Sequence, residues 1–164
     1  VGNNFDVGDF GIHLTAPAKE VYDVVVADNR LNSCAIQIEN INSTGTLPGL
    51  QVHDNVVVDP NDTHGIALVD CDRATVHHNT VRTFDMVTAD TYDGINLDAD
   101  CSGCLVDHNQ IITDNGELRY GINGPAGNFA VGNQMGAAAD YGTGAFGGSL
   151  TLTYPGSGND NFVA

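Results

Sequence analysis

Val52-His53-Asp54-Asn55-Val56-Val57 returns along the chain as Val76-His77-His78-Asn79-Thr80-Val81 and again as Val106-Asp107-His108-Asn109-Gln110-Ile111. Each copy has a β-branched residue, two further residues, an Asn, one variable residue and an apolar residue. The Asn of this pattern stands at positions 4, 29, 55, 79, 109 and 133, so the period is near 25 residues. A repeat of this length predicts a solenoid, in which successive turns of chain stack and like residues lie above like residues. The recurrent Asn at one corner predicts a ladder of side-chain amides.

A second pattern, Gly-Ile-x-Leu, lies between the copies of the first. It reads Gly11-Ile12-His13-Leu14, Gly65-Ile66-Ala67-Leu68 and Gly94-Ile95-Asn96-Leu97, with Ala35-Ile36-Gln37-Ile38 as a variant. Alternation of apolar and polar residues is typical of a strand with one buried face. The chain therefore alternates two strand signals, and we predict an all-β fold whose stacked turns lie about 4.8 Å apart.

The paired repeat over residues 1–135 resembles that of right-handed parallel β-helix proteins of the pectate-lyase-like superfamily, including the tailspike and polysaccharide-active types. The resemblance implies a right-handed parallel β-helix, a solenoid of about five to six rungs. It does not fix the chemistry, because this fold hosts lyases, hydrolases, epimerases, tailspikes and structural modules. Residues 136–164 leave the repeat and hold seven Gly. We predict that they form a Gly-rich C-terminal appendage, which serves as a cap, an oligomerisation strand or a linker.

The charge of the chain excludes one class of function. Five Lys and Arg stand against 21 Asp and Glu, so the net charge is −16. A nucleic-acid binder needs a basic face, so no nucleic-acid partner is expected. No run of about 18 apolar residues occurs, so no membrane insertion is expected. The acidity has two interpretations that stay open: adaptation to high salt, in which charges are screened, or the binding of divalent cations.

Pairs of Asp close to the ends of predicted strands are candidate metal ligands. Asp70-Cys71-Asp72 and Asp98-Ala99-Asp100 follow two copies of Gly-Ile-x-Leu, and Asp70 and Asp100 share one register. Because hard cations take oxygen ligands, Asp70, Asp72 and Asp100 are the predicted metal ligands. Ca²⁺ is the candidate ion, and no other cofactor is predicted.

The sequence predicts that the cysteines are chiefly core residues. Cys71 and Cys101 each stand eight residues before an Asn of the repeat, so they share one register on neighbouring rungs. Small buried thiols are common in protein cores. A Cys71–Cys101 disulfide, which would suit a secreted protein, is the open alternative. Cys101-Ser102-Gly103-Cys104 lacks the second Cys pair of a zinc site.

The connections after the Asn residues differ in length. From each Asn to the next Gly-Ile, or to its Ala35-Ile36 variant, the distances along the chain are 7, 6, 10, 15 and 12 residues. Longer loops of a solenoid gather on one edge, which is often the binding edge. Aromatic rings offer apolar area to sugars, while polar groups bond to hydroxyls. The predicted substrate-binding residues on this edge are His64, Tyr92, Arg119 and Tyr120.

The stretch Tyr92-Asp93-Gly94-Ile95-Asn96-Leu97-Asp98 is similar to the Asp-Gly-Ile segment of polygalacturonase-type β-helix hydrolases. The resemblance implies that Asp93 and Asp98 are a catalytic acid pair, since glycosidases cleave with two carboxyl groups. His77 is the third catalytic candidate. It shares a register with His53 and Asp107, and an imidazole beside a carboxylate can transfer protons.

These features predict an extracellular or virion-borne module that binds or degrades a glycan, and its partner would be a polysaccharide or a cell-surface glycan. Hydrolase, lyase and epimerase activities are all open, as is the absence of catalysis. The alternative is a structural or adhesive module of a viral spike, capsid or cell-surface assembly. The resemblance to viral β-helices implies a homotrimer. The opening residues read as the close of a rung, which predicts membership of a longer chain or assembly.

Overall fold

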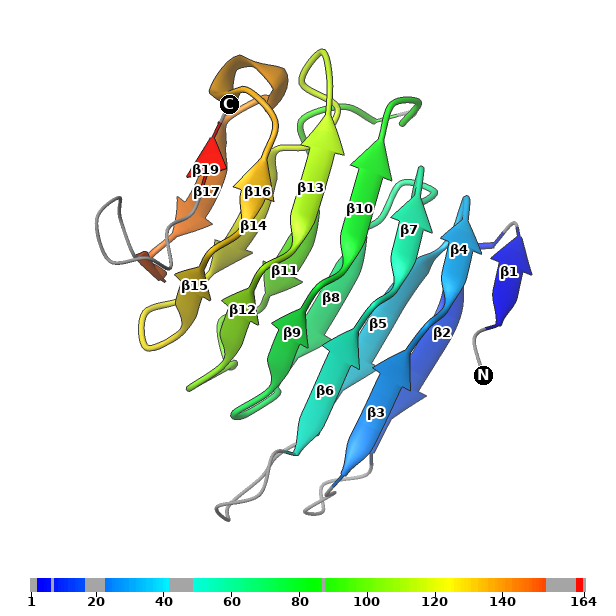
Figure 1. Ribbon diagram of the computed structural model, residues 1–164, viewed down its shortest axis with the longest axis vertical. Helices are drawn as coiled ribbons and strands as arrows, with labels where there is room; N and C mark the ends of the chain where they lie inside the picture. Colours follow the sequence, from blue (N-terminus) through cyan, green and yellow to red (C-terminus); the bar gives the residue numbers. More distant parts are fainter. Residues whose placement is uncertain are drawn as a thin grey trace.

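A computed structural model of the protein describes residues 3–6, 8–16, 23–41, 49–86, 88–152 and 162–163. The strands of these residues form three parallel sheets, which wind as a β-solenoid of about five turns (Figure 1). Each turn contributes one strand to each sheet, so a strand's neighbours come from the turns before and after it. The predicted all-β parallel solenoid is confirmed. In the described part of the chain, no helix is long and apolar enough to cross a membrane.

The three sheets follow one another within each turn. The first sheet contains β2 (Phe10–Thr15), β5 (Ala35–Glu39), β8 (Ile66–Val69), β11 (Ile95–Leu97), β14 (Tyr120–Gly124) and β17 (Gly144–Gly148). The second contains β3 (Val24–Ala27), β6 (Leu50–His53), β9 (Thr75–His77), β12 (Leu105–Asp107), β15 (Phe129–Val131) and β18 (Thr151–Leu152). The third contains β1 (Asn4–Asp6), β4 (Arg30–Asn32), β7 (Val56–Val58), β10 (Thr80–Thr83), β13 (Gln110–Thr113), β16 (Gln134–Met135) and β19 (Phe162–Val163).

The Gly-Ile-x-Leu pattern forms the first sheet and supplies rows of the core. Ile66 pairs in register with Ile95, and Leu68 pairs with Leu97; all four side chains are buried. Like residues therefore lie above like residues in successive turns, as predicted. A Cβ on Gly94 would lie 2.7 Å from a carbonyl oxygen of the next turn. Gly94 begins its copy of the pattern because the next turn approaches too closely there for a side chain.

The recurrent Asn forms a tight corner between the second and third sheets. The N–H and Nδ2 of Asn55 both donate to Oδ1 of Asn79 at 3.0 Å, and Asn79 donates likewise to Asn109 at 2.9 and 3.0 Å. The three side chains are at most 1% exposed. The predicted amide ladder is confirmed, and it satisfies polar groups that are buried in every turn.

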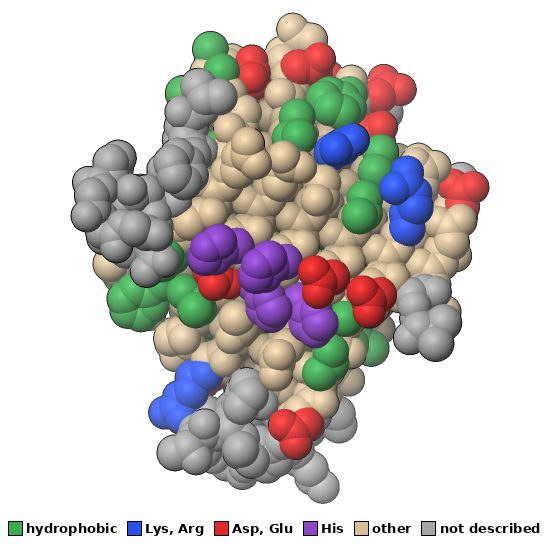
Figure 2. Space-filling view, in the orientation of Figure 1, with side chains coloured by type: hydrophobic (Ala, Val, Ile, Leu, Met, Phe, Trp, Pro, Cys, Tyr) green, Lys and Arg blue, Asp and Glu red, His purple; other side chains and the backbone are tan. Residues whose placement is uncertain are grey.

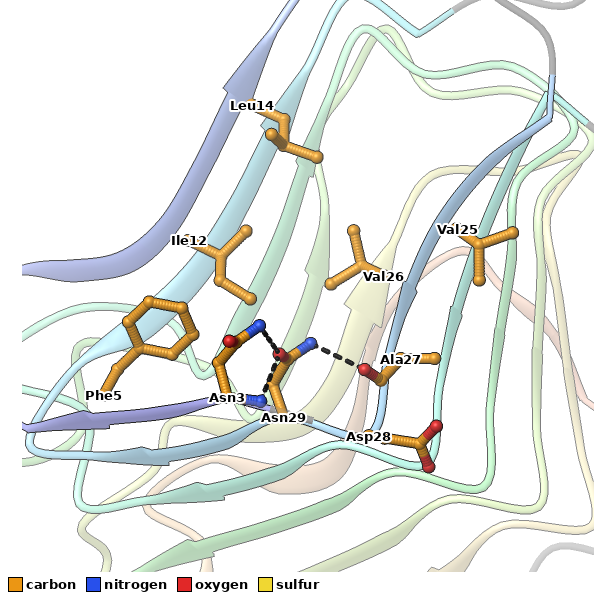
Figure 3. A pocket seen from close by; sticks show the side chains of 9 residues that line it. All are labelled: Asn3, Phe5, Ile12, Leu14, Val25, Val26, Ala27, Asp28 and Asn29. Carbon is orange, nitrogen blue, oxygen red and sulfur yellow. Dashed lines mark hydrogen bonds between the residues drawn. The ribbon is translucent and has the colours of Figure 1, made fainter. Parts of the chain in front are cut away.

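The ladder differs from the sequence pattern by one residue in the first turn. Asn3, not Asn4, donates its N–H and Nδ2 to Oδ1 of Asn29, both at 3.2 Å (Figure 3). Asn4 is the first residue of β1 and pairs with Arg30. The placement of Asn4 in the ladder was wrong, because a shift of one residue moves a strand's side chains to the opposite face.

Figure 3 also shows the end of the core beside β1, β2 and β3. Phe5, Ile12, Leu14 and Val26 line a hollow of about 470 Å³ there. These side chains continue the apolar rows that later turns bury. The hollow therefore lies at the end of the core that the first turn forms.

The residues after 135 extend all three sheets. β17 pairs with β14, β18 with β15 and β19 with β16. A short 3₁₀ helix, Ala138–Asp140, leads to Tyr141, whose buried hydroxyl donates to the Ile111 carbonyl at 2.9 Å. The domain boundary at residue 135, and the role of 136–164 as cap, oligomerisation strand or linker, stay predictions.

All four cysteines are buried free thiols, as the register predicted for Cys71 and Cys101. The N–H of Cys71 donates to Sγ of Cys101 at 3.5 Å. Burial raises the pKa of Cys71 to about 12, so this thiol stays protonated at neutral pH. The structure therefore has Cys71 and Cys101 as neighbouring thiols in the core and not as a disulfide.

Candidate functional site

A hollow of about 540 Å³ opens beside the first sheet, on the edge that carries the long connections. We call it the loop-edge hollow; its lining residues are Asp9, Phe10, Gln37, Asn61, Asp62, Thr63, His64 and Tyr92. The side chain of Phe10 is 40% exposed, and that of Tyr92 is half-buried. Two rings among amides and carboxylates provide apolar area together with groups that bond to hydroxyls. The hollow contains two of the four predicted substrate-binding residues, His64 and Tyr92.

Hydrogen bonds and ring packing fix the His64 side of the hollow. The ring of His64 meets that of Tyr92 edge-on, with centroids 5.7 Å apart. The N–H of Asp93 donates to Nδ1 of His64 at 2.9 Å. Burial lowers the pKa of His64. The ring is therefore neutral, and since Nδ1 accepts a hydrogen bond, the proton is assigned to Nε2.

Asp93 is fully buried and ion-paired behind the hollow. Arg119 donates from Nε to Oδ1 of Asp93 at 3.0 Å and from its terminal nitrogen to Oδ2 at 2.8 Å. The hydrogen bond to Asp93 raises the pKa of Arg119. A carboxylate bound through both oxygens and closed to water is in no position to exchange a proton with a substrate.

The structure does not bring Asp93 and Asp98 together. Asp93 precedes β11 and Asp98 follows it, so five extended residues place them about 16 Å apart. Glycosidase carboxyl pairs lie about 5–10 Å apart. Asp98 instead closes a turn, where its Oδ1 accepts the N–H of Asp70 at 3.0 Å and that of Asp100 at 3.1 Å.

The other predicted substrate-binding residues lie outside the lining of the hollow. The Arg119 guanidinium stands 5.3 Å from the centre of the Tyr120 ring. In their place, the earlier turns supply Phe10, Gln37 and Asn61, which sequence reasoning missed. One signal was present, because Phe10 directly precedes a Gly-Ile pair and Tyr92 stands two residues before another.

The predicted Ca²⁺ ligands have other hydrogen-bonding roles. Asp70 and Asp100 both bind Asp98 through their backbone N–H groups, and Asp72 accepts a hydrogen bond from the Ser102 hydroxyl. Among the residues that the structure describes, no three His, Cys, Asp or Glu side chains converge as a metal site. Ca²⁺ at Asp70, Asp72 and Asp100 stays a prediction.

A cluster of histidines covers the outside of the tight corner (Figure 2). We call it the histidine patch; its members, two consecutive residues from each of three turns, are His53, Asp54, His77, His78, Asp107 and His108. The sequence predicted the row of His53, His77 and Asp107. Sequence reasoning missed the second row, which contains His78 and His108. Both are turn residues with left-handed φ, 55° and 50°, and strand alternation does not predict which way the side chain of such a residue points.

The rings of the histidine patch stack along the solenoid. His53 lies on His77 with centroids 4.9 Å apart and planes 13° apart, and His78 lies on His108 at 5.5 Å and 8°. Between the two stacks, Nδ1 of His77 is 2.9 Å from Nδ1 of His78. Four imidazoles thus meet at one place on the surface.

Two carboxylates flank these rings. Nδ1 of His53 bonds to Oδ2 of Asp54 at 2.8 Å, and this bond lowers the pKa of Asp54. Nδ1 of His108 bonds to Oδ2 of Asp107 at 3.2 Å. The other oxygen of Asp107, Oδ1, is buried and has no hydrogen-bond partner among the described residues. A buried carboxylate oxygen without a partner is costly.

Comparison with known proteins gives one family. A family model described as "Periplasmic copper-binding protein (NosD)" matches residues 1–135, the same range as the repeat. No curated protein and no solved structure matches the chain. The comparison supports the parallel β-helix resemblance at the level of the fold, and it supplies no match to the pectate-lyase-like tailspike type.

Proposed function

The chain belongs to the NosD family of periplasmic copper-binding proteins, and we propose that it works outside the cytoplasm as a module that binds a glycan in the loop-edge hollow. One observation carries the proposal: an exposed Phe10 ring and a half-buried Tyr92 ring share a hollow with amide and carboxylate groups. The periplasmic description of the family supports the location. A virion surface, a high-salt habitat and a trimer stay predictions.

The charges of the hollow favour a neutral glycan. Its lining contains Asp9 and Asp62 and has neither Lys nor Arg. Arg119, behind it, is already paired with Asp93. An anionic sugar such as a uronate would meet two carboxylates without a compensating cation, on a chain of net charge −16.

The positions of the carboxylates favour binding without cleavage. Asp93 is buried in its ion pair, and about 16 Å of strand separates it from Asp98. A glycosidase needs two carboxyl groups on opposite sides of one bond. The proposed function is therefore recognition of a neutral glycan.

Calorimetric titration with neutral and uronic oligosaccharides tests this proposal. We expect neutral oligosaccharides to bind and Phe10→Ala to weaken them about tenfold, because a stacked ring contributes about 1 kcal/mol or slightly more. Phe129→Ala is the matched control, since Phe129 is similarly exposed at 43% but belongs to β15, outside the hollow. Absence of binding, or equal losses in both variants, would contradict the proposal and favour the structural or adhesive module.

The family description favours a second candidate function, the binding of a copper ion. The histidine patch is the observation that supports it, because imidazole nitrogens are ligands that suit copper. The Asp107 carboxylate, whose Oδ1 is buried without a hydrogen-bond partner among the described residues, adds a negative charge beside them. A titration of the full chain with Cu²⁺ is expected to show one bound ion, and a chain that binds none would contradict this candidate.

A further inference from the structure

The two central imidazoles of the histidine patch have the spacing of a chelate. Nδ1 of His77 and Nδ1 of His78 are 2.9 Å apart. Two nitrogens that each lie about 2.0–2.1 Å from one ion, at a right angle, are also about 2.9 Å apart. In the absence of an ion this spacing is a hydrogen bond in which one nitrogen donates and the other accepts. The two atoms therefore have the spacing that one shared ion would give them.

The backbone holds this pair in place. His77 ends β9, and His78 follows it with a left-handed φ of 55°. The next residue, Asn79, is 1% exposed and bonded into the amide ladder on both sides. Since consecutive residues lock the turn, binding would require little reorganisation of the main chain.

Asp107 places a carboxylate beside the pair. It is the register partner of His77 on the next turn. Its Oδ2 bonds to His108, which leaves the buried Oδ1 without a hydrogen-bond partner among the described residues. A cation bound by the pair would be attracted to this carboxylate, which lies beside the site and, among the described residues, does not converge with the two nitrogens as a third ligand.

The outer two histidines support the pair and are not assigned as ligands of the same ion. His53 and His108 stack nearly parallel on His77 and His78, with centroids 4.9 and 5.5 Å apart. Their Nδ1 atoms are already bonded to carboxylates, those of Asp54 and Asp107. This arrangement agrees with the finding that no three donors converge among the described residues.

We propose that Nδ1 of His77 and Nδ1 of His78 chelate one Cu²⁺ ion in an open site. The Asp107 carboxylate lies beside this site, and water would fill the remaining ligand positions. This inference rests on the second candidate function and assigns its ligands. Two imidazoles at a right angle suit the tetragonal preference of Cu²⁺. The hard cations Ca²⁺ and Mg²⁺ prefer all-oxygen sites and are excluded by this donor set.

The test uses the full chain without a histidine tag and CuSO₄ as the probe. Calorimetry measures affinity and stoichiometry, and electron paramagnetic resonance counts the nitrogens on the ion. We expect one Cu²⁺ per chain with two nitrogen ligands, and we expect Ca²⁺ not to displace it. His78→Asn and His77→Gln should each weaken binding at least tenfold. Asn tolerates the left-handed φ of residue 78, and a melting curve checks that each variant is folded.

His13→Gln is the matched control. His13 is also exposed and lies 3.2 Å from a carboxylate, that of Glu39, but no second imidazole bonds to it. Its substitution should leave Cu²⁺ binding unchanged. If the wild type binds Cu²⁺ and the substitutions at 77 and 78 have no greater effect than His13→Gln, this assignment is wrong while copper binding stands. If the wild type binds no Cu²⁺, both are wrong, and the glycan titration is unaffected.

Discussion

The tight corner and the loop edge satisfy their buried polar groups in different ways. At the tight corner, Asn55, Asn79 and Asn109 make the same contacts in successive turns, at 2.9–3.0 Å. At the loop edge each contact occurs once. Arg119 donates to the two oxygens of Asp93 at 3.0 and 2.8 Å. In a separate contact between turns, the N–H of Met86 donates to Oε2 of Glu117 at 2.8 Å.

The difference shows where a solenoid can vary. A member of a repeated row has a neighbour above and below, so its replacement leaves polar groups unsatisfied in two turns. Loss of a single contact at the loop edge leaves polar groups unsatisfied at one place only. The inside of the tight corner is therefore fixed by the fold, while its outer face and the loop edge can carry chemistry particular to a few turns, as the histidine patch and the loop-edge hollow do.

Asn79→Ala should have the largest effect on stability. The substitution removes the acceptor for the N–H and Nδ2 of Asn55 and the donor to the Val52 carbonyl at 2.9 Å, all inside the corner. Each unsatisfied buried group costs about 1–3 kcal/mol, so we expect a loss of about 4 kcal/mol in the free energy of unfolding. Urea titration measures this loss, and the slope of the free energy of unfolding against urea concentration should be unchanged.

Gln110→Ala is the matched control for the corner. Gln110 directly follows the ladder residue Asn109, but its side chain is only half-buried, and the hydrogen bond from its Nε2 to Gln134 at 3.1 Å is exposed to water. An exposed contact of this kind should change the free energy of unfolding by less than about 0.5 kcal/mol. Equal losses in the two variants would mean that the ladder contributes no more than a surface pair.

Arg119→Ala tests a single contact of the loop edge. It leaves the Asp93 carboxylate buried without its cation. Because 37% of the Arg119 side chain is exposed, water can replace part of the interaction, and we expect a loss of about 2 kcal/mol. Adding Asp93→Asn should recover part of that loss, since it removes the unpaired charge. A double variant less stable than Arg119→Ala would contradict the ion-pair explanation.

The same contrast explains how far the sequence could predict the molecule. The solenoid and the Asn row were predictable because they recur, and a period is visible without a structure. The Arg119–Asp93 pair joins two loops 26 residues apart and occurs once, so no pattern signals it. Asp93 was consequently predicted to be catalytic, because the residues around it resemble the Asp-Gly-Ile segment of β-helix hydrolases. The His78 side of the patch was missed because a left-handed turn residue does not follow strand alternation.

The pH dependence of stability tests the environment of His64. Burial lowers the pKa of His64 in the folded protein, so below about pH 6.5 the unfolded chain binds more protons at this residue. Stability should therefore fall as the pH drops from about 7 to about 5. His64→Asn keeps an acceptor for the Asp93 N–H but does not titrate, so its stability should vary less with pH. Identical pH profiles in urea titrations would refute this role.

Thr83→Val should have the smallest effect and the opposite sign. Thr83 and Thr113 are register partners at the ends of β10 and β13, where the loop edge begins. Both hydroxyls are buried, and neither has a hydrogen-bond partner among the described residues. Replacing an unsatisfied hydroxyl with a methyl group of the same shape should be neutral or stabilising by up to about 1 kcal/mol. If urea titration instead shows that Thr83→Val lowers the free energy of unfolding by more than about 1 kcal/mol, the hydroxyls of Thr83 and Thr113 would be hydrogen-bonded, as the Asn side chains of the ladder are. The tight corner and the loop edge would then not differ in how they satisfy these buried polar groups.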